Sequence, residues 1–256
     1  MLHLLKLEWL KVKNYRTFWI FMALYVVGLF GINYIAFQFQ LELEKKAPLR
    51  IFPYDFPKIW QTIGWVSSWL LYFPGMIMIL VITNEFTYKT HRQNIVDGLT
   101  RGQFVTGKIL GGIALALITT IICTLNVVLF GIMSDNTIST SGSEFILYYF
   151  VQSLSYLFVA LIIAVLVRRG ALSIGIFFLY GLVFENLLGA ILTYYKLGRA
   201  WYFFPLQSTD ELIPLPFGKE LLQRDVPGIP MLITIALVYI VLFALLSRRR
   251  YQTADL

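Results

Sequence analysis

Few residues in this 256-residue chain could do chemistry. The clearest motif is the stretch GQFVTGK at 102–108, which matches the G-x-x-x-x-G-K pattern of a phosphate-binding loop. Such a loop needs a Ser or Thr directly after the lysine to hold Mg²⁺, and a strand before it. Ile109 follows the lysine instead, and the residues before it favour a short amphipathic helix. We therefore predict that this chain binds no nucleotide.

Histidine and cysteine chemistry is equally restricted. His3 and His91 lie outside the apolar stretches, so the chain lacks both the paired histidines of a membrane metalloprotease and a histidine base at membrane depth. Cys123 is the single cysteine, which excludes a disulfide framework and a cysteine metal cluster. The sequence thus predicts no catalytic residue, no metal site and no cofactor on this chain.

Glu185 is the one acidic residue inside a long apolar stretch, and Asn186 follows it directly. A charge at membrane depth costs about 2.5–3.5 kcal/mol on insertion scales, so such residues usually face the bundle interior or a cavity. Two interpretations remain open. Glu185 and Asn186 could line a translocation path or a dimer seam, or Glu185 could be a protonated carboxyl that is hydrogen-bonded to a neighbouring helix.

The elements that must position these residues are membrane helices. The chain is 58% hydrophobic and 14% charged, whereas a soluble domain has roughly 25% charged residues. Pro74 and Gly75 predict a kink in the second of the apolar stretches. Stretches of about 20 apolar residues, long enough to cross a bilayer, cover 18–37, 63–82, 109–132, 145–167, 171–194 and 229–247. We expect an all-α membrane protein with six spans in a single domain, 1–256.

Lysine and arginine residues set the expected orientation. They are concentrated in the N-terminal segment, in the loop at 84–108, in the turn at 168–169 and in the C-terminal tail, whereas the opposite loops hold most of the acidic residues. Cytoplasmic loops carry the excess of positive charge. We therefore expect both termini, and the loop at 84–108, in the cytoplasm.

Two short helices are expected outside the spans. Leu2, Leu5 and Trp9 begin an apolar stripe along 2–12, and the lysines beside it can meet anionic headgroups, so this segment is predicted to be an interfacial helix. The sequence KELLQR, at 219–224, favours another short helix in the long loop before the last span.

The loop at 84–108 specifies more structure than a simple connection needs. Thr90 and Gln93 form a capping box, and Gly98 suits a left-handed helix stop. Thr100 begins a second capping box, which would start a helix that runs into the third span. A helix as short as 90–98 is marginal alone, so it must pack either on its own bundle or on a partner protein. The residues themselves leave both open.

The stretch at 84–110, NEFTYKTHRQNIVDGLTRGQFVTGKIL, has a recognisable sequence pattern. It occurs together with an expected interfacial helix and six expected spans. Together they resemble ATP-binding-cassette (ABC) transporter permeases of the type-2 exporter class, in particular the separate permease subunits related to bacitracin and lantibiotic exporters. In that class the loop between the second and third spans holds a coupling helix. This helix sits in a groove on a separate ATPase subunit and transmits ATP-driven closure to the spans.

The resemblance implies that 90–98 is the coupling helix, with Glu85 and Arg101 at the ends of its loop. The residues expected in or near the ATPase contact are Thr90, His91, Arg92, Gln93, Asn94, Ile95, Gly98 and Leu99. ATP and Mg²⁺ would bind two partner ATPase chains, and a second copy or a related permease would complete the exporter. The chain would lie in bacterial inner-membrane lipid, without enzymatic activity and without nucleic acid.

Other functions fit the same layout. The chain could be a membrane anchor or force-transmitting subunit, which couples a cytoplasmic ATPase to an outer partner without its own transport path. A free-standing channel is a third class, and it predicts no ATPase partner at all. These alternatives differ in whether an ATPase binds the loop and whether a cavity serves a transported molecule.

Overall fold

The computed structural model describes residues 2–46, 51–88, 90, 99–134, 137, 139–217 and 226–253, and every regular element among them is a helix. In chain order these are α1 (Leu2–Lys13), α2 (Arg16–Lys46), α3 (Ile59–Ser68), α4 (Tyr72–Thr87), α6 (Arg101–Met133), α7 (Glu144–Val167), α8 (Gly170–Phe178), the π-helix η1 (Leu179–Phe184), α9 (Glu185–Tyr194), the 3-10 helix η2 (Gly198–Phe203), α10 (Gln207–Asp210) and α11 (Ile229–Thr253). The predicted all-α class is confirmed for these residues. The short helix expected at 219–224 lies outside them.

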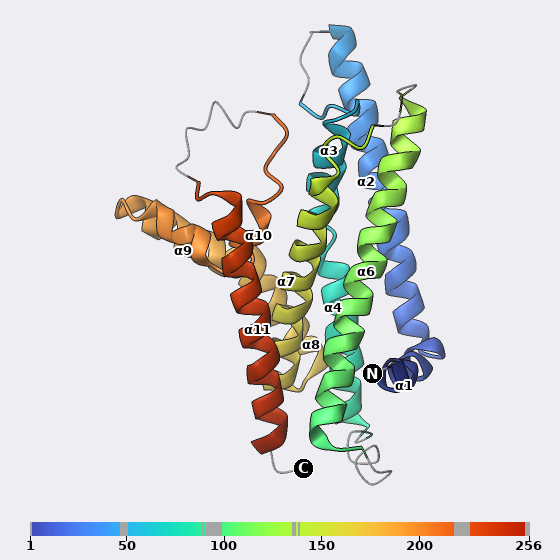
Figure 1. The fold of residues 1–256 in the computed structure, drawn as a ribbon, viewed down its shortest axis with the longest axis vertical. Helices are drawn as coiled ribbons and strands as arrows, with labels where there is room; N and C mark the ends of the chain where they lie inside the picture. The colour runs from blue at the N-terminus through green and yellow to red at the C-terminus, as the bar shows by residue number, and fades with distance from the viewer. Residues whose placement is uncertain are drawn as a thin grey trace.

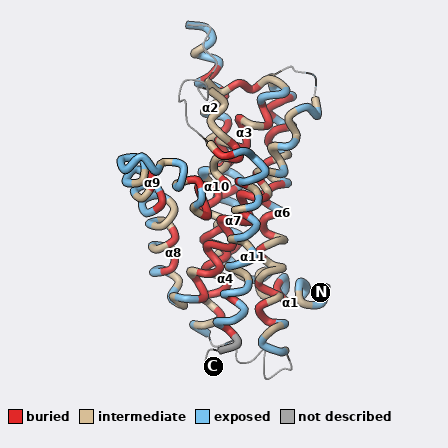
Figure 2. Tube along the Cα trace, turned by 60° about the vertical axis from the view of Figure 1, so that its left-hand side comes forward, coloured by how far each residue is buried: buried red, intermediate tan, exposed pale blue. Residues whose placement is uncertain are grey.

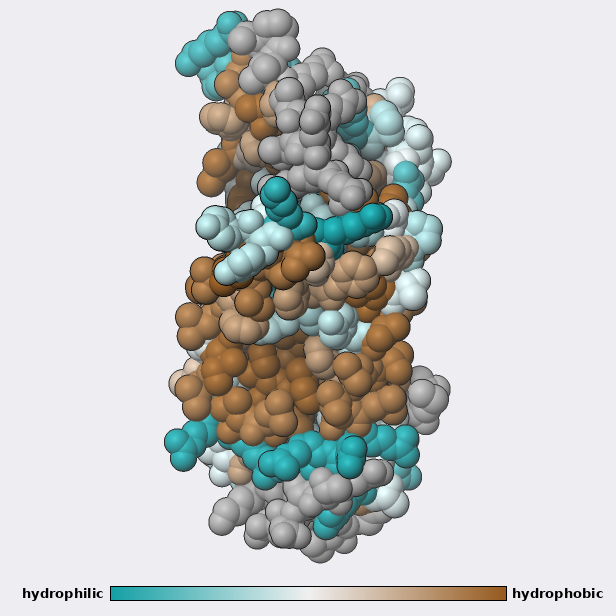
Figure 3. Space-filling view, turned by 90° about the vertical axis from the view of Figure 1, so that its left-hand side faces the viewer, coloured by the Kyte–Doolittle hydropathy of each residue, from teal (hydrophilic) through white to brown (hydrophobic). Residues whose placement is uncertain are grey.

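Five helices are each long and apolar enough to cross a bilayer: α2, α6, α7, the run Gly170–Tyr194 and α11. The pair α3–α4 passes the same test only as one span, bent by 45° at a short break. Figure 3 shows a broad apolar belt on one face, bordered below by a band of hydrophilic side chains. The chain is therefore a multi-pass membrane protein, and each of the six expected stretches lies in one of these segments.

Both chain ends lie at the same end of the elongated bundle (Figure 1). We call this the terminal end; it holds α1, the last turn of α4, the first turn of α6 and the last turn of α11. α1 is seen end-on in Figure 1, so it lies across the bundle rather than along it. It exposes Leu5, Trp9 and Leu10 and buries Glu8. This arrangement supports the expected interfacial position of α1.

Two helices extend beyond the apolar stretches that predicted them. α2 continues past 37 to Lys46, where Gln40 is buried and its side-chain oxygen accepts the backbone N–H groups of Ile51 and Phe52 at 2.9 and 2.8 Å. α11 continues past 247 to Thr253, and its Tyr251 is buried. Both extensions beyond the apolar stretches therefore carry residues that pack against other parts of the chain.

The second span bends at 69–71, one turn before the predicted kink at Pro74 and Gly75. Proline lacks the amide hydrogen that would bond to the carbonyl of Leu70 in a continuous helix. That carbonyl accepts instead from the N–H of Phe73 at 3.0 Å. The proline thus sits in the first turn of α4, where a missing N–H is tolerated, and the bend falls on the residues before it.

Gly75 has a separate packing role. A Cβ atom at this position would overlap the ring of Phe177, a fully buried residue of α8. The missing side chain therefore allows α8 to approach α4 closely.

α7 forms the centre of the bundle. In its most apolar 18-residue window 83% of residues are buried, against 11% in α11, and Figure 2 shows the buried residues gathered around α7 and α4. Hydroxyl groups join it to its neighbours: Thr119 of α6 and Ser153 lie 2.8 Å apart, and Tyr25 of α2 and Tyr149 lie 2.9 Å apart. Thr119 and Ser153 thus serve as interhelical hydrogen-bonding groups.

Candidate functional site

The predicted coupling loop connects α4 to α6 at the terminal end. Glu85 is buried in the last turn of α4, Thr90 is exposed, Leu99 is half-buried, and Arg101 is exposed at the start of α6. The remaining expected contact residues, and with them the first capping box, lie outside the described part of the chain: His91, Arg92, Gln93, Asn94, Ile95 and Gly98. The contact role of the whole set stays a prediction.

The second predicted capping box is present. The Thr100 side-chain oxygen accepts the backbone N–H of Gln103 at 3.2 Å, and the Gln103 side-chain oxygen accepts the backbone N–H of Thr100 at 2.9 Å. This reciprocal pair satisfies two of the amide groups that every helix leaves free at its start. α6 therefore begins at Arg101 and continues without a break into the third span, as predicted.

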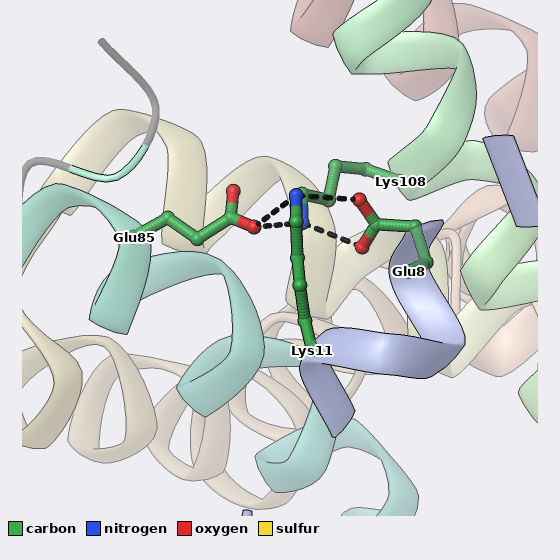
Figure 4. A network of polar contacts seen from close by, with 4 residues as sticks. All are labelled: Glu8, Lys11, Glu85 and Lys108. Carbon is green, nitrogen blue, oxygen red and sulfur yellow. Dashed lines mark hydrogen bonds and ion pairs between the residues drawn. The ribbon is translucent and has the colours of Figure 1, made fainter. Parts of the chain in front are cut away.

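Four charged side chains meet just inside this loop (Figure 4). The Lys108 ammonium lies 2.6 Å from one oxygen of Glu8 and 2.5 Å from one oxygen of Glu85. The Lys11 ammonium lies 3.1 Å from the other Glu8 oxygen and 2.9 Å from the same Glu85 oxygen. Only 2% of the Lys108 side chain is exposed, against 28% for Lys11. We call these four residues the charge cluster; it joins α1 to both helices that flank the loop.

The electrostatics of the charge cluster favour the ionised forms. Burial by itself would raise the pKa of Glu8, but the ammonium groups of Lys108 and Lys11 outweigh it and hold that pKa below its ordinary value. Burial would likewise lower the pKa of Lys11, but Glu85 and Glu8 hold it above its ordinary value. Two cations and two anions therefore form a locally neutral unit, in which removing one member leaves a buried charge uncompensated.

An aromatic group extends the charge cluster to the rest of the terminal end. The Phe104 ring lies 5.3 Å from the Lys108 ammonium and 5.4 Å from that of Lys11, both within cation–π range. Tyr251 of α11 packs against Phe104 at 5.3 Å and stacks on Phe86 of α4 at 5.6 Å between ring centres. The ends of α1, α4, α6 and α11 are thereby packed into one unit around the loop.

Glu185 lies away from this unit, at the junction of η1 and α9. It is 2% exposed, and its two carboxylate oxygens accept the backbone N–H groups of Leu206 and Gln207 at 3.2 and 2.9 Å. Asn186 is exposed and donates to carbonyl groups one turn back in its own helix, those of Gly181 and Leu182, both at 3.2 Å. The structure therefore places Glu185 against the segment that follows α9, and places Asn186 on the surface.

The segment that follows α9 also carries a polar residue that the sequence did not single out. The Asp210 carboxylate accepts from the Gln152 amide at 2.9 Å and from the Tyr156 hydroxyl at 3.1 Å, both on α7. Burial, together with the nearby carboxylates of Glu185 and Glu211, raises the pKa of Asp210 to about 7, although the hydrogen bonds from Gln152 and Tyr156 oppose the shift. The loop predicted before the last span therefore packs back into the bundle at α10.

Comparison with protein-family models gave a match over most of the chain. The family model described as ABC-2 family transporter protein matches residues 4–184. The chain belongs to the ABC-2 transporter family. Permeases of this family are membrane transport components and generally work with an ABC ATPase. The search of curated proteins gave no match.

The match places the charge cluster within the ABC-2 part of the chain. Residues 4–184 run from α1 to the end of η1, so they include the whole cluster and the loop at 84–108, and they stop one residue before Glu185. The resemblance to an ABC transporter permease of the type-2 class is thereby confirmed. The segments α9, η2, α10 and α11 lie beyond the matched residues.

The phosphate-loop motif of this ABC-2 protein has a structural explanation. Residues 102–108 form the first two turns of α6, not a loop after a strand. Its lysine, Lys108, is the most buried member of the charge cluster. The sequence did not predict the cluster because Glu8 and Lys108 are 100 positions apart. The signal that could have pointed to it is a single acidic residue in an otherwise basic helix, 2–13.

Proposed function

We propose that the chain is the membrane permease subunit of an ATP-driven exporter, and that a separate ATPase chain, which carries ATP and Mg²⁺, docks on residues 90–98. Two ATPase chains would serve a pair of permeases, either two copies of this chain or this chain and a related one. The chain would cross the bacterial cytoplasmic membrane six times with both termini inside. The family assignment supports the permease role, and the shared terminal end supports a common side for both termini and the loop.

The observation that carries this proposal is the charge cluster. A docking segment can transmit force only if the helices on either side of it move with it. Here Glu85, in the last turn of one flanking helix, lies 2.5 Å from Lys108, two turns into the other, and the linked α1 adds a third element. A push on 90–98 would therefore move the bases of α4 and α6 as one unit, rather than flexing the loop.

The path from this base leads to the centre of the bundle. α4 packs along α7 and ends at the bend at 69–71, and residues on both sides of that bend line a cavity with Asn186 and α10. In this proposal α4 moves as a rigid element about the bend at 69–71, and the cavity is the part of the translocation path that changes shape. Asn186 lines the path, and Glu185 holds the start of α10 in place through two hydrogen bonds.

Affinity capture tests the docking step. Tagged chain is isolated from its native membranes in mild detergent, and the ATP hydrolysis of the co-purified complex is measured. Arg92→Glu should reduce ATPase recovery several-fold, because it reverses a charge on the expected docking helix. Arg16→Glu, the same change at an exposed site of the terminal end, should leave recovery unchanged.

Three results would go against the proposal. Recovery of no ATPase with the unaltered chain would favour a channel. Equal recovery with both variants would remove Arg92 from the contact. An ATPase that binds and hydrolyses ATP while reconstituted vesicles move no organic solute would favour the anchor or force-transmitting function.

A further inference from the structure

A cavity of about 930 Å³ lies between the bend at 69–71, α7, η1–α9, η2–α10 and the start of α11. Its size falls within the range of small-molecule sites. The lining is rich in aromatic side chains: Trp65, Trp69, Tyr72, Tyr156, Trp201 and Phe217. Two acidic residues, Asp210 and Glu211, also line it, and none of the described residues around it is basic.

This lining selects for charge as well as for apolar surface. The faces of tryptophan and tyrosine rings attract cations within about 6 Å and repel anions. An ionised carboxylate adds a negative charge, and partial burial makes its attraction for a cation stronger than at a fully exposed surface. The ring planes also offer the flat apolar contact that a hydrophobic body needs. A neutral or anionic molecule would gain the apolar contact but not the electrostatic attraction.

The position of Asp210 fits the same chemistry. Gln152 and Tyr156 hold its carboxylate in place from α7. The titratable groups that face it are Glu185 and Glu211, together with Tyr156 and Tyr72. Among the described residues, Asp210 is therefore held by neutral hydrogen-bond donors and faces acidic or neutral groups, so its carboxylate is placed to attract a cation.

We propose that this cavity binds an amphipathic organic cation, with its charged centre beside Asp210 and Glu211 and its apolar body against the tryptophan rings. The binding is a property of this chain alone. Only the further step of calling the ligand a cargo rests on the proposed permease function.

The test uses two probes of one shape and opposite charge, tetraphenylphosphonium and tetraphenylborate. Purified chain in nanodiscs, without ATPase, is equilibrated with radiolabelled probe, and binding to empty nanodiscs is subtracted. We expect saturable binding of the phosphonium and none of the borate. The double variant Asp210→Asn/Glu211→Gln should bind the phosphonium at least tenfold more weakly. The matched double variant Glu42→Gln/Glu144→Gln, which removes two exposed carboxylates elsewhere, should bind as the unaltered chain does.

A second variant keeps the test valid if the acidic double variant folds poorly. Trp69→Leu removes a cavity-lining ring that is 56% exposed, and should weaken phosphonium binding several-fold. Trp19→Leu removes a ring that is 47% exposed on α2, far from the cavity, and should change nothing. Because the probe has a fixed charge, its affinity should rise as the pH increases through about 7, where Asp210 ionises.

Equal binding of the two probes, or full phosphonium binding by both cavity variants, would overturn the proposal. These results concern the isolated chain, so they are separable from the permease proposal. If the unaltered chain binds no phosphonium but still recovers an ATPase in an Arg92-dependent way, the cavity site alone would be overturned. Normal phosphonium binding, combined with recovery of no ATPase in the affinity capture, would overturn the exporter function and leave the cavity site standing.

Discussion

Lys108 gives the sharpest test of the charge cluster. Replacing it with Met keeps a long unbranched side chain but removes an ammonium that contacts both buried carboxylates, at 2.6 and 2.5 Å. Glu8 and Glu85 would then share the single charge of Lys11. We therefore expect Lys108→Met to be strongly destabilising.

The magnitude follows from burial. Removing one partner of a buried ion pair costs about 3–5 kcal/mol. Because Lys11 still contacts both carboxylates, we expect the low end for Lys108→Met, about 3 kcal/mol. The Lys11 side chain is 28% exposed, so water screens it, and Lys11→Met should cost only about 1 kcal/mol. The ranking of the two lysines is the distinctive part of this prediction.

Thermal unfolding in detergent, followed by tryptophan fluorescence, measures the effect. At about 2–4 °C per kcal/mol for a chain of this size, Lys108→Met should lower the Tm by about 6–12 °C. A double-mutant cycle adds Glu85→Gln: the double variant leaves Glu8 and Lys11 as a balanced pair. It should therefore lose less stability than the sum of the single changes.

Two outcomes would refute this reasoning. A Lys108→Met chain as stable as the unaltered one would mean that the charge cluster contributes nothing to the fold. A larger loss for Lys11→Met than for Lys108→Met would mean that burial does not set the strength of these contacts. In either case the cluster could not hold the bases of α4 and α6 together.

Three further predictions concern separate features. Gly75→Ala should cost about 1–3 kcal/mol in unfolding free energy, because its Cβ overlaps a buried ring of α8, whereas Gly31→Ala, with open space around it, should be neutral or slightly stabilising; equal effects would contradict the packing. Thr100→Ala should cost about 1 kcal/mol through loss of the helix cap, and Thr100→Ser should restore it. The stabilisation that Glu8 adds through its lowered pKa is complete above pH 4.5 and is lost as the pH falls through the folded-state pKa. The stabilisation from Lys11, whose pKa is raised, is complete below pH 10.5 and is lost as the pH rises through the folded-state pKa. The stability differences between the unaltered chain and Glu8→Gln or Lys11→Met should therefore be level between pH 4.5 and 10.5, and a difference that slopes there would contradict the corresponding assignment.

Local features were predictable because they depend on neighbouring residues. The Thr100–Gln103 capping box is complete within four residues, and the structure has it as predicted. The apolar stretches likewise located the crossing segments, because length and hydropathy are properties of continuous sequence. The proline predicted the bend correctly, but the prediction placed it one turn too far along the chain. A proline affects the carbonyl four residues before it, so the bend falls before Pro74.

Long-range pairing was not predictable in the same way. Lys108 in the sequence is a lysine near the start of a span, and nothing beside it indicates Glu8 or Glu85 as its partners. Asp210 falls in the long loop expected before the last span, and no local pattern there shows that α10 packs back against α7. A buried charged or polar group needs partners to be stable, but a single sequence does not identify which distant residues supply them.

We propose that ATP-driven closure at residues 90–98 moves the rest of the bundle through the charge cluster. The most direct measurement is the distance between spin labels at Phe39→Cys on α2 and Tyr194→Cys on α9, both exposed, in a Cys123→Ser background with the ATPase bound. We predict that ATP binding shifts this distance in the otherwise unaltered chain, and that Lys108→Met abolishes the shift while ATP still binds. An ATP-induced shift that persists in Lys108→Met would contradict the account.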